Sequence, residues 1–338
     1  MKYKILIPAL LIISFSIGYL VSRKINPVQK DKDGVPQEIQ KPLEKYSFEN
    51  LQTVDIPTGT FKELQTLSED GEYTSHLFQF RFVPGINDRN YKTTTGVINY
   101  PKSSNNKKYP VAILIRGYVD QKNYTSGSGT KNVGLYLAKN GFMTVAPDFL
   151  GYADSDSEAG NIFESRFQTY TTIISLIKSI ENGMLSDFWD GKNLFIWGHS
   201  NGGQIAITTL EIAGENYPTV LWAPVSKPFP YSVLYYTDSS DDRGKLIRSE
   251  LSKFEELYDV EKYSLTNYLD KITADIQLQQ GSNDDAVPIS WSDALATKLR
   301  SLGENVDYIK YNGADHNMRP DWDSAVNQTL EFFKSHLK

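Results

Sequence analysis

A serine at a sharp turn is the strongest chemical signal in the sequence. The segment G-H-S-N-G at 198–202 places Ser200 between an apolar run, 194–197, and a helical pattern that begins near Gln204. Strand, sharp turn and helix in that order lift a hydroxyl out of the edge of a sheet, where a substrate can reach it. Glycines suit such a turn because the strand and the helix crowd each other there. Ser200 is therefore a candidate nucleophile; the alternative is a glycine-rich turn with an idle serine.

Four histidines could act as the base for this serine. A serine hydroxyl attacks efficiently only when a base takes its proton, and that base is usually a histidine oriented by a carboxylate. His199 lies inside the turn, where we expect its side chain to point away from the partner of the serine. His76 falls in an early strand-like stretch, and His336 lies near the C-terminus. His316, in a loop after the last apolar stretch, is left as the candidate base.

The orienting acid is expected between the serine and the histidine, because α/β-hydrolases carry serine, acid and histidine in that order along the chain. Residues 276–279 have the pattern of a strand, and the polar turn that follows holds two adjacent carboxylates. We choose Asp284 as the orienting acid, with Asp285 as the alternative. An aspartate at such a place can also serve simply to form the turn.

The chain resembles the α/β-hydrolases, and among them the prolyl-oligopeptidase-like serine peptidases and their esterase relatives. The resemblance covers about residues 75–336 and is carried by four motifs: G-H-S-N-G-G at 198–203, G-x-x-D-x-x-V-P at 281–288, G-A-D-H at 313–316 and P-D-F-L-G-Y-A-D-S at 147–155. It implies a triad of Ser200, Asp284 and His316 that transfers an acyl group to water. A serine-type peptidase is the function it favours. A carboxylesterase on the same fold and a catalytically idle surface binding module are the alternatives.

Backbone N–H groups must also face the oxyanion that forms during acyl transfer. Asn201, directly after the nucleophile, is expected to supply one of them. Tyr118, which follows an apolar stretch and the pair Arg116-Gly117, is expected to supply the other. The family often has His-Gly where this chain has Arg116-Gly117. Neither donor depends on a side chain, and we expect Arg116 to form a structural ion pair.

Composition favours an enzyme domain that needs no cofactor. The net charge is −6 and no basic stripe is interleaved with aromatics, so a nucleic-acid partner is not expected. The chain has no cysteine, which excludes disulfides, thiolate nucleophiles and zinc sites with cysteine ligands. With four histidines and none at H-E-x-x-H spacing, a catalytic metal is not expected either. The expected partners are a peptide or small ester substrate and, through the N-terminal segment, a membrane.

An apolar run near the N-terminus, 5–21, lies between Lys2 and Lys4 on one side and Arg23 and Lys24 on the other. A helix over this run would span about 25 Å, and the flanking charges could reach the headgroups of a ~30 Å core. Residues 1–24 are therefore expected to be a membrane anchor that holds the catalytic domain outside the cytoplasm. The alternative is a cleaved signal and a secreted protein. Residues 25–50, rich in Lys, Asp, Gln, Pro and Glu, are expected to be a polar linker.

Residues 51–338 are expected to form the hydrolase domain. Strand-like and helix-like stretches alternate from residue 111 onward, which predicts a mostly parallel sheet of the eight-stranded type with helices on both faces. Two earlier stretches, 73–83 and 91–100, predict an antiparallel pair at the sheet edge. Residues 226–270, approximately, interrupt the alternation and are expected to be a small cap. Its aromatic and acidic side chains could bind substrate, the acids holding a basic group, or could pack among themselves as a helical lid.

Overall fold

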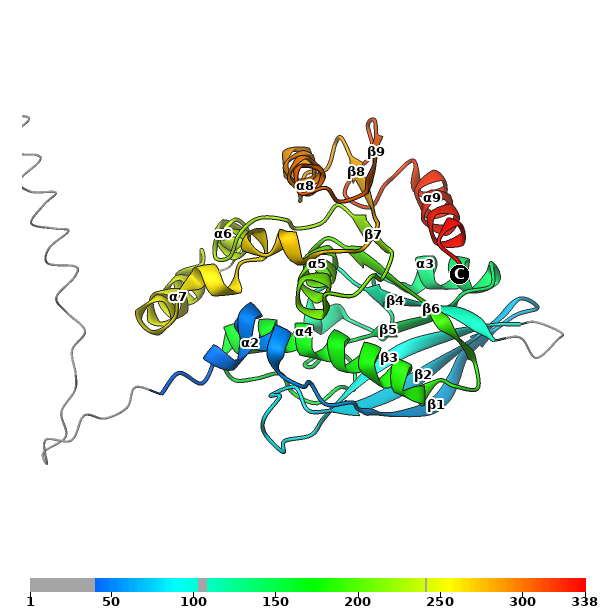
Figure 1. Ribbon diagram of the computed structural model, residues 1–338, viewed down its shortest axis with the longest axis horizontal. Helices are drawn as coiled ribbons and strands as arrows, with labels where there is room; N and C mark the ends of the chain where they lie inside the picture. Colours follow the sequence, from blue (N-terminus) through cyan, green and yellow to red (C-terminus); the bar gives the residue numbers. More distant parts are fainter. Residues whose placement is uncertain (1–39, 103–107, 241) are drawn as a thin grey trace, which may run out of the picture. The chain divides into compact units, whose positions relative to one another are not determined.

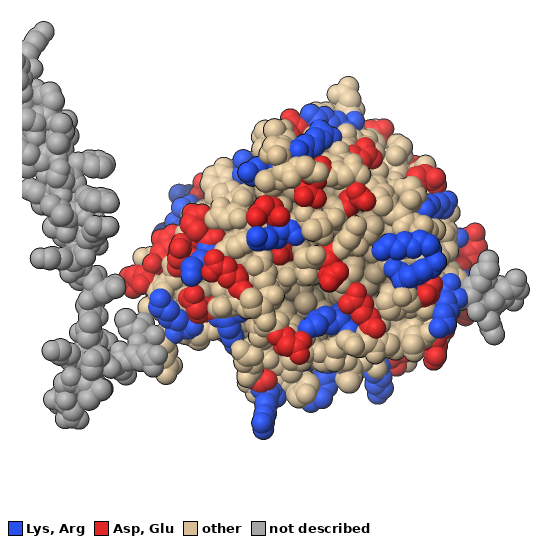
Figure 2. Space-filling model, viewed as in Figure 1, with Lys and Arg blue, Asp and Glu red and all other residues tan. Residues whose placement is uncertain are grey.

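The computed structural model describes residues 40–102, 108–240 and 242–338. Leu43–Lys338 form one compact unit. The predicted anchor and most of the predicted linker lie outside the described residues. Within the described ranges, no helix is both long enough and apolar enough to cross a membrane. Acidic and basic side chains are interspersed over the face of the molecule shown in Figure 2.

A nine-stranded sheet runs through the compact unit in the order β1-β2-β3-β5-β4-β6-β7-β8-β9 (Figure 1). The strands from β1 to β5 in this order pair antiparallel, and those from β5 to β9 pair parallel. The mostly parallel sheet agrees with the prediction. The bounds are β1 Thr60–Glu69, β2 Tyr73–Phe82, β3 Lys92–Pro101, β4 Tyr109–Ile115, β5 Met143–Pro147, β6 Trp189–His199, β7 Thr219–Trp222, β8 Ile276–Gly281 and β9 Val306–Tyr311.

Helices cover both faces of this sheet (Figure 1). Two helices bury their apolar sides in one core cluster, α3 (Lys131–Lys139) and α9 (Trp322–Ser335). Three others contribute to the larger cluster on the opposite face: α4 (Ile162–Ser179), α5 (Asn201–Ala213) and α8 (Ile289–Ser301). A strand buried on both faces must be apolar along its length. β4 shows this, because all its side chains from Val111 to Ile115 are buried.

The compact unit begins before residue 51, so the predicted linker boundary needs correction. Tyr46, Phe48 and Leu51 are buried in the larger core cluster. Ser47 caps the short helix α2 (Phe48–Thr53), accepting a hydrogen bond from the N–H of Asn50, and α2 packs against α5. These apolar side chains join the core, which a solvated linker would not do.

The antiparallel pair predicted at the sheet edge, β2 and β3, lies one strand further in. β1 pairs with β2 and forms the edge, which makes the sheet nine-stranded rather than eight-stranded. All side chains of β1 are exposed or half-buried, and the strand has two register shifts against β2. An edge strand with so little burial leaves only a faint hydrophobic pattern in the sequence.

The predicted cap is a largely helical insertion between β7 and β8. It includes α6 (Tyr231–Leu234), α7 (Lys245–Leu257) and several short 3-10 turns. Asp238 pairs with Arg248 at 3.0 Å, and Asp242 accepts hydrogen bonds from backbone N–H groups at the start of α7. These two acids are therefore engaged within the cap. Their contacts favour a lid that satisfies its own side chains over a binding site for a basic group.

Candidate active site

Ser200 stands at the turn between β6 and α5. Its φ of 57° and ψ of −119° lie in a region that is strained for a residue with a side chain. The Ser200 N–H donates to the carbonyl of Trp222 at 2.8 Å, and the Ser200 carbonyl accepts from the N–H of Val225 at 3.0 Å. These hydrogen bonds tie the turn to β7 and the segment after it, which holds the strained conformation in place.

Two glycines of the turn have no room for a side chain. A Cβ at Gly202 would lie 2.0 Å from the carbonyl oxygen of Ile115, and a Cβ at Gly198 would lie 2.6 Å from the carbonyl oxygen of Gly202. The start of α5 can therefore press against the end of β4. This contact brings Ser200 beside the loop that follows β4.

His316 and Asp284 meet on the loops that follow β9 and β8. Nδ1 of His316 lies 2.8 Å from Oδ2 of Asp284, whose side chain is fully buried. Oδ1 of Asp284 accepts hydrogen bonds from the backbone N–H groups of Ala286 and Val287 at 2.9 and 2.8 Å. Burial would raise the pKa of Asp284, but the hydrogen bonds from His316 and Val287 hold this pKa below its ordinary value. An ionised Asp284 accepts only, so Nδ1 of His316 carries the proton.

The other acid considered from the sequence, Asp285, is exposed to solvent. The hydrogen bond to His316 is made by Asp284. Of the remaining histidines, His76 pairs with Glu63 at 2.7 Å on the β1–β2 ribbon, and His336 lies at the end of α9 beside Phe332.

His199 faces His316, so the expectation that its side chain points away is wrong. The two rings lie 4.7 Å apart between centroids, and Nε2 of His199 lies 2.9 Å from the carbonyl oxygen of His316. The reason is strand alternation. His199 shares a face of β6 with Trp197, and Trp197 belongs to the core cluster under α9. The loop that carries His316 leads into α9 and so passes over this face.

The pKa of His199 falls from 6.5 to about 4, because of its burial and, less strongly, repulsion from His316. The ring is therefore neutral near pH 7. It can donate from Nε2 to the His316 carbonyl while it leaves Nδ1 unprotonated. His199 thus fixes the backbone of the residue that Asp284 orients.

No hydrogen bond joins the Ser200 hydroxyl to the His316 ring within the described part of the chain. The two residues are brought near each other by His199, which precedes Ser200 and whose ring lies against that of His316. Hydrogen bonds between catalytic groups are often long without substrate and tighten when it binds.

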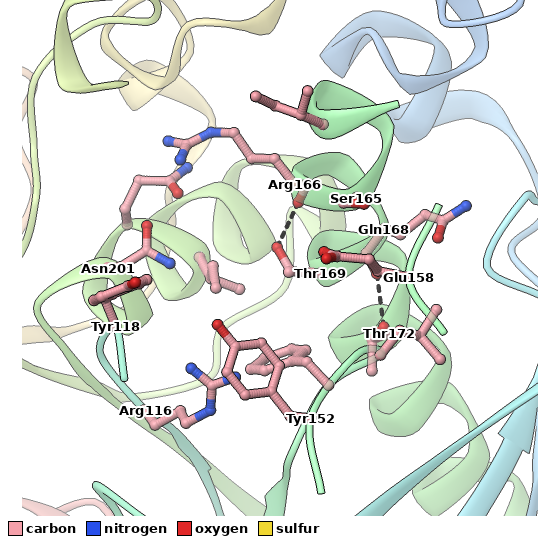
Figure 3. A pocket seen from close by; sticks show the side chains of 15 residues that line it. Arg116, Tyr118, Tyr152, Glu158, Ser165, Arg166, Gln168, Thr169, Thr172 and Asn201 are labelled. Atoms are coloured by element: carbon pink, nitrogen blue, oxygen red, sulfur yellow. Dashed lines mark hydrogen bonds between the residues drawn. The ribbon is translucent and has the colours of Figure 1, made fainter. Parts of the chain in front are cut away.

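The two expected oxyanion donors lie beside Ser200. A Cβ at Gly117 would come within 3.0 Å of the Cβ of Ser200, so the loop that continues to Tyr118 runs directly past the serine. Neither the N–H of Tyr118 nor that of Asn201 donates to a protein oxygen in the described residues. Both residues line one pocket, as Figure 3 shows. Both N–H groups are therefore available to a substrate oxygen.

Arg116 braces the loop, though not by the expected ion pair. The buried guanidinium donates to the carbonyls of Gly117 at 3.0 Å and Asp148 at 2.9 Å. It also lies 3.7 Å from the centre of the Tyr152 ring. The Asp148 carboxylate is bonded instead to hydroxyl and backbone groups of other residues. Arg116 thus links the loop after β4, which carries Tyr118, to the loop after β5 through carbonyl oxygens.

A pocket of about 300 Å³ opens on the side of Tyr118 and Asn201 (Figure 3). Its wall comes from the loops after β4 and β5, from α4 and from the start of α5. Arg166 of α4 lines this wall, and no sequence motif marks it. The residue is one of many polar side chains in a long helix, and only the folded position of α4 beside the turn marks it.

Within the described ranges, no group of three or more His, Asp or Glu side chains is arranged to hold a metal ion.

The sheet order, the serine turn and the three loops that meet there define an α/β-hydrolase. The sequence profile of the prolyl oligopeptidase family matches residues 130–338. That match covers more than half of the chain, which therefore belongs to the prolyl oligopeptidase family and is a serine hydrolase.

Solved structures share the fold at low sequence identity. An acetyl xylan esterase from a Paenibacillus species is 15% identical with a TM-score of 0.62, over 93% of this chain and 98% of that one. Acetyl xylan esterase 1 from a Thermoanaerobacterium species is 17% identical with a TM-score of 0.58, over 86% and 94%. The acylaminoacyl peptidase of Pyrococcus horikoshii is 16% identical with a TM-score of 0.54, over 84% of this chain and 51% of that one. No curated protein sequence matches this chain. At these identities the likeness establishes the fold alone.

Proposed function

We propose that the protein hydrolyses acyl compounds with Ser200 as nucleophile, His316 as base and Asp284 as orienting acid. The hydrogen bond between Nδ1 of His316 and the buried Asp284 carries the proposal. It commits the Nδ1 proton to the carboxylate, so Nε2 is the ring nitrogen that can accept the serine proton. The strained turn presents the Ser200 hydroxyl from the same end of the sheet.

The reaction proceeds in two balanced steps. Oγ of Ser200 bonds to the carbonyl carbon while His316 takes its proton, and the carbonyl electrons move to the oxygen that faces the N–H groups of Asn201 and Tyr118. The oxyanion then collapses, the bond to the leaving group breaks, and His316 returns the proton to that group. Water repeats the sequence on the acyl-enzyme and releases the acid.

Peptide bonds are the first substrate class we propose, because the matching family is one of peptidases. Carboxylic esters are the second. The observation that favours esters is the share of each similar protein's length that this chain spans. The chain spans nearly the whole of the two acetyl xylan esterases, but about half of the acylaminoacyl peptidase.

A fluorophosphonate probe and a substrate panel test both parts of the proposal. We expect the probe to label the wild type and not Ser200→Ala. Turnover of aminoacyl-arylamides would establish a peptidase, whereas turnover of short-chain aryl esters alone would establish an esterase. Absence of labelling together with absence of turnover would overturn the proposal and leave the binding module.

We also propose that residues 1–24 tether the catalytic domain to the outer side of a cytoplasmic membrane. The support is the apolar run at 5–21 and its flanking basic residues. Cell fractionation and protease added to intact cells test it. Recovery of a shortened protein in the medium would instead establish a cleaved signal, and a protease-resistant protein inside intact cells would contradict both.

A further inference from the structure

Arg166 is a cation in the pocket wall without an anionic partner. Its side chain is half-buried, and its Nε is enclosed without a hydrogen bond. No ion pair involves Arg166 among the residues that the structure describes. Figure 3 shows the side chain extending from α4 toward the side of the pocket where Asn201 and Tyr118 lie.

The neutral polar side chains that α4 and Gln204 contribute to this wall already donate hydrogen bonds within the protein. The hydroxyls of Ser165, Thr169 and Thr172 donate to backbone carbonyls. The amide Nε2 groups of Gln168 and Gln204 donate to tyrosine hydroxyls at 3.2 and 2.8 Å. Among the polar side chains of α4 in this wall, Arg166 is the one whose side chain donates no hydrogen bond within the described residues.

The other charged side chains of the wall do not neutralise Arg166. Arg116 is bonded to two carbonyls and stacked on an aromatic ring. Glu158, the acid in the lining, is exposed and accepts a hydrogen bond from Gln121 at 3.2 Å. A partly buried charge without an ion-pair partner is unfavourable, and a bound anion relieves that cost. The wall is therefore suited to an anionic group.

The position of the pocket indicates which part of the substrate it receives. The leaving group must face His316 to receive its proton, and the carbonyl oxygen must face Asn201 and Tyr118. Asn201 and Tyr118 line the pocket, whereas neither His316 nor Asp284 does. The pocket consequently holds the acyl part of the substrate.

We infer that Arg166 binds a second, negatively charged carboxylate on the acyl group that is transferred to Ser200. The substrate class is an acidic residue on the acyl side of a peptide bond or, if the bond is an ester, a half-ester of a dicarboxylic acid. A guanidinium matches a carboxylate with two parallel hydrogen bonds. Arg166 is then a specificity-determining residue. This inference rests on the proposed function of Ser200.

Two ester substrates that differ only in one carboxylate, assayed with the full-length protein, test the inference. The pair is the 1-naphthyl ester of adipic acid with its far carboxylate free, and the same ester with that carboxylate methylated. We expect kcat/KM of the wild type to favour the anionic ester by about 10-fold or more, as for other hydrogen bonds to charged groups. Arg166→Gln should lose most of that preference and Arg166→Lys part of it. Arg89→Gln, which removes an exposed arginine outside the pocket lining, should keep it.

A second measurement on the wild type guards against a variant that does not fold. Glutarate should slow fluorophosphonate labelling at lower concentration than its neutral diamide, glutaramide, does, and added salt should reduce the difference. Equal protection by the two compounds would overturn the inference. So would a preference for the anionic ester that is absent in the wild type or retained in Arg166→Gln. Turnover of the methylated ester would in these cases still support the role of Ser200. Absence of labelling and of turnover of either ester overturns both.

Discussion

Nε2 of His199 lies 2.9 Å from the carbonyl oxygen of His316, and the two imidazoles face each other at 4.7 Å. Two histidines at one site therefore have different roles in the structure. His316 is bonded through its side chain to Asp284, whereas His199 holds the backbone of His316. The low pKa of His199, about 4, keeps it neutral, so its hydrogen bond positions the loop without placing a charge beside the ring of His316.

The stability of the fold should depend on the protonation of His199. Its pKa is 6.5 ordinarily and about 4 in the fold, so between these pH values the unfolded chain binds a proton that the folded chain does not. The stability that the low pKa of His199 adds to the fold is fully present above pH 6.5 and is lost as pH falls toward 4. His199→Asn removes this titration, so between pH 7 and 4.5 the wild type should lose about 1–2 kcal/mol more than the variant. Urea unfolding at both pH values measures the difference; equal losses would contradict the assignment.

Asp284 and Asp285 form a natural matched pair. Asp284→Asn replaces the carboxylate that accepts the Nδ1 proton of His316 with a neutral amide. The correct tautomer of His316 and its protonated ring are then no longer stabilised, so kcat should fall by a factor of about 10³ to 10⁴. Asp285→Asn, at an exposed neighbour, should change kcat by less than about twofold. Steady-state kinetics with an activated aryl ester distinguish them. A larger loss of kcat in Asp285→Asn than in Asp284→Asn would show that Asp284 is not the orienting acid.

The turn at Ser200 should not tolerate a methyl group at Gly202. The added Cβ would lie 2.0 Å from the carbonyl oxygen of Ile115, which forces α5 away from β4. We expect Gly202→Ala to lower the free energy of unfolding by about 3 kcal/mol and to reduce kcat strongly. Gly71→Ala is the control, because no atom lies within 4 Å of its added Cβ. Similar stabilities for the two variants would contradict the close approach.

Arg116 should affect the rate through the loop that carries Tyr118. Lysine keeps the charge but cannot bridge the carbonyls of Gly117 and Asp148 as the guanidinium does. Arg116→Lys should lower kcat by about 10-fold, as expected when an oxyanion donor is displaced in part. The rate of fluorophosphonate labelling should fall in parallel. A variant that loses thermal stability but labels at the wild-type rate would show that Arg116 only stabilises the fold.

Sequence patterns were sufficient where the chemistry is local. The strand, turn and helix around Ser200 follow in the predicted order, since glycines and apolar runs mark them directly, although β6 begins at Trp189 and α5 at Asn201, both earlier than predicted. The strand predicted at 276–279 is β8, which begins at Ile276 as expected and runs on to Gly281.

Contacts between distant segments were not predictable in the same way. The orientation of His199 depends on α9 and on the loop before it, more than a hundred residues away. The free guanidinium of Arg166 is recognised only when the partners of its neighbours are known. The role of Arg116 was mistaken because its acceptors are backbone carbonyls, which carry no sequence signal.

The most direct test of the account is to identify the residue that carries the acyl group during turnover. The protein is mixed with an activated acetate ester, quenched in acid and mapped by peptide mass spectrometry. We expect one acetyl group, on Ser200, that is absent from Ser200→Ala and accumulates more slowly in Asp284→Asn. Acetylation at another residue, or turnover by Ser200→Ala at the wild-type rate, would contradict it.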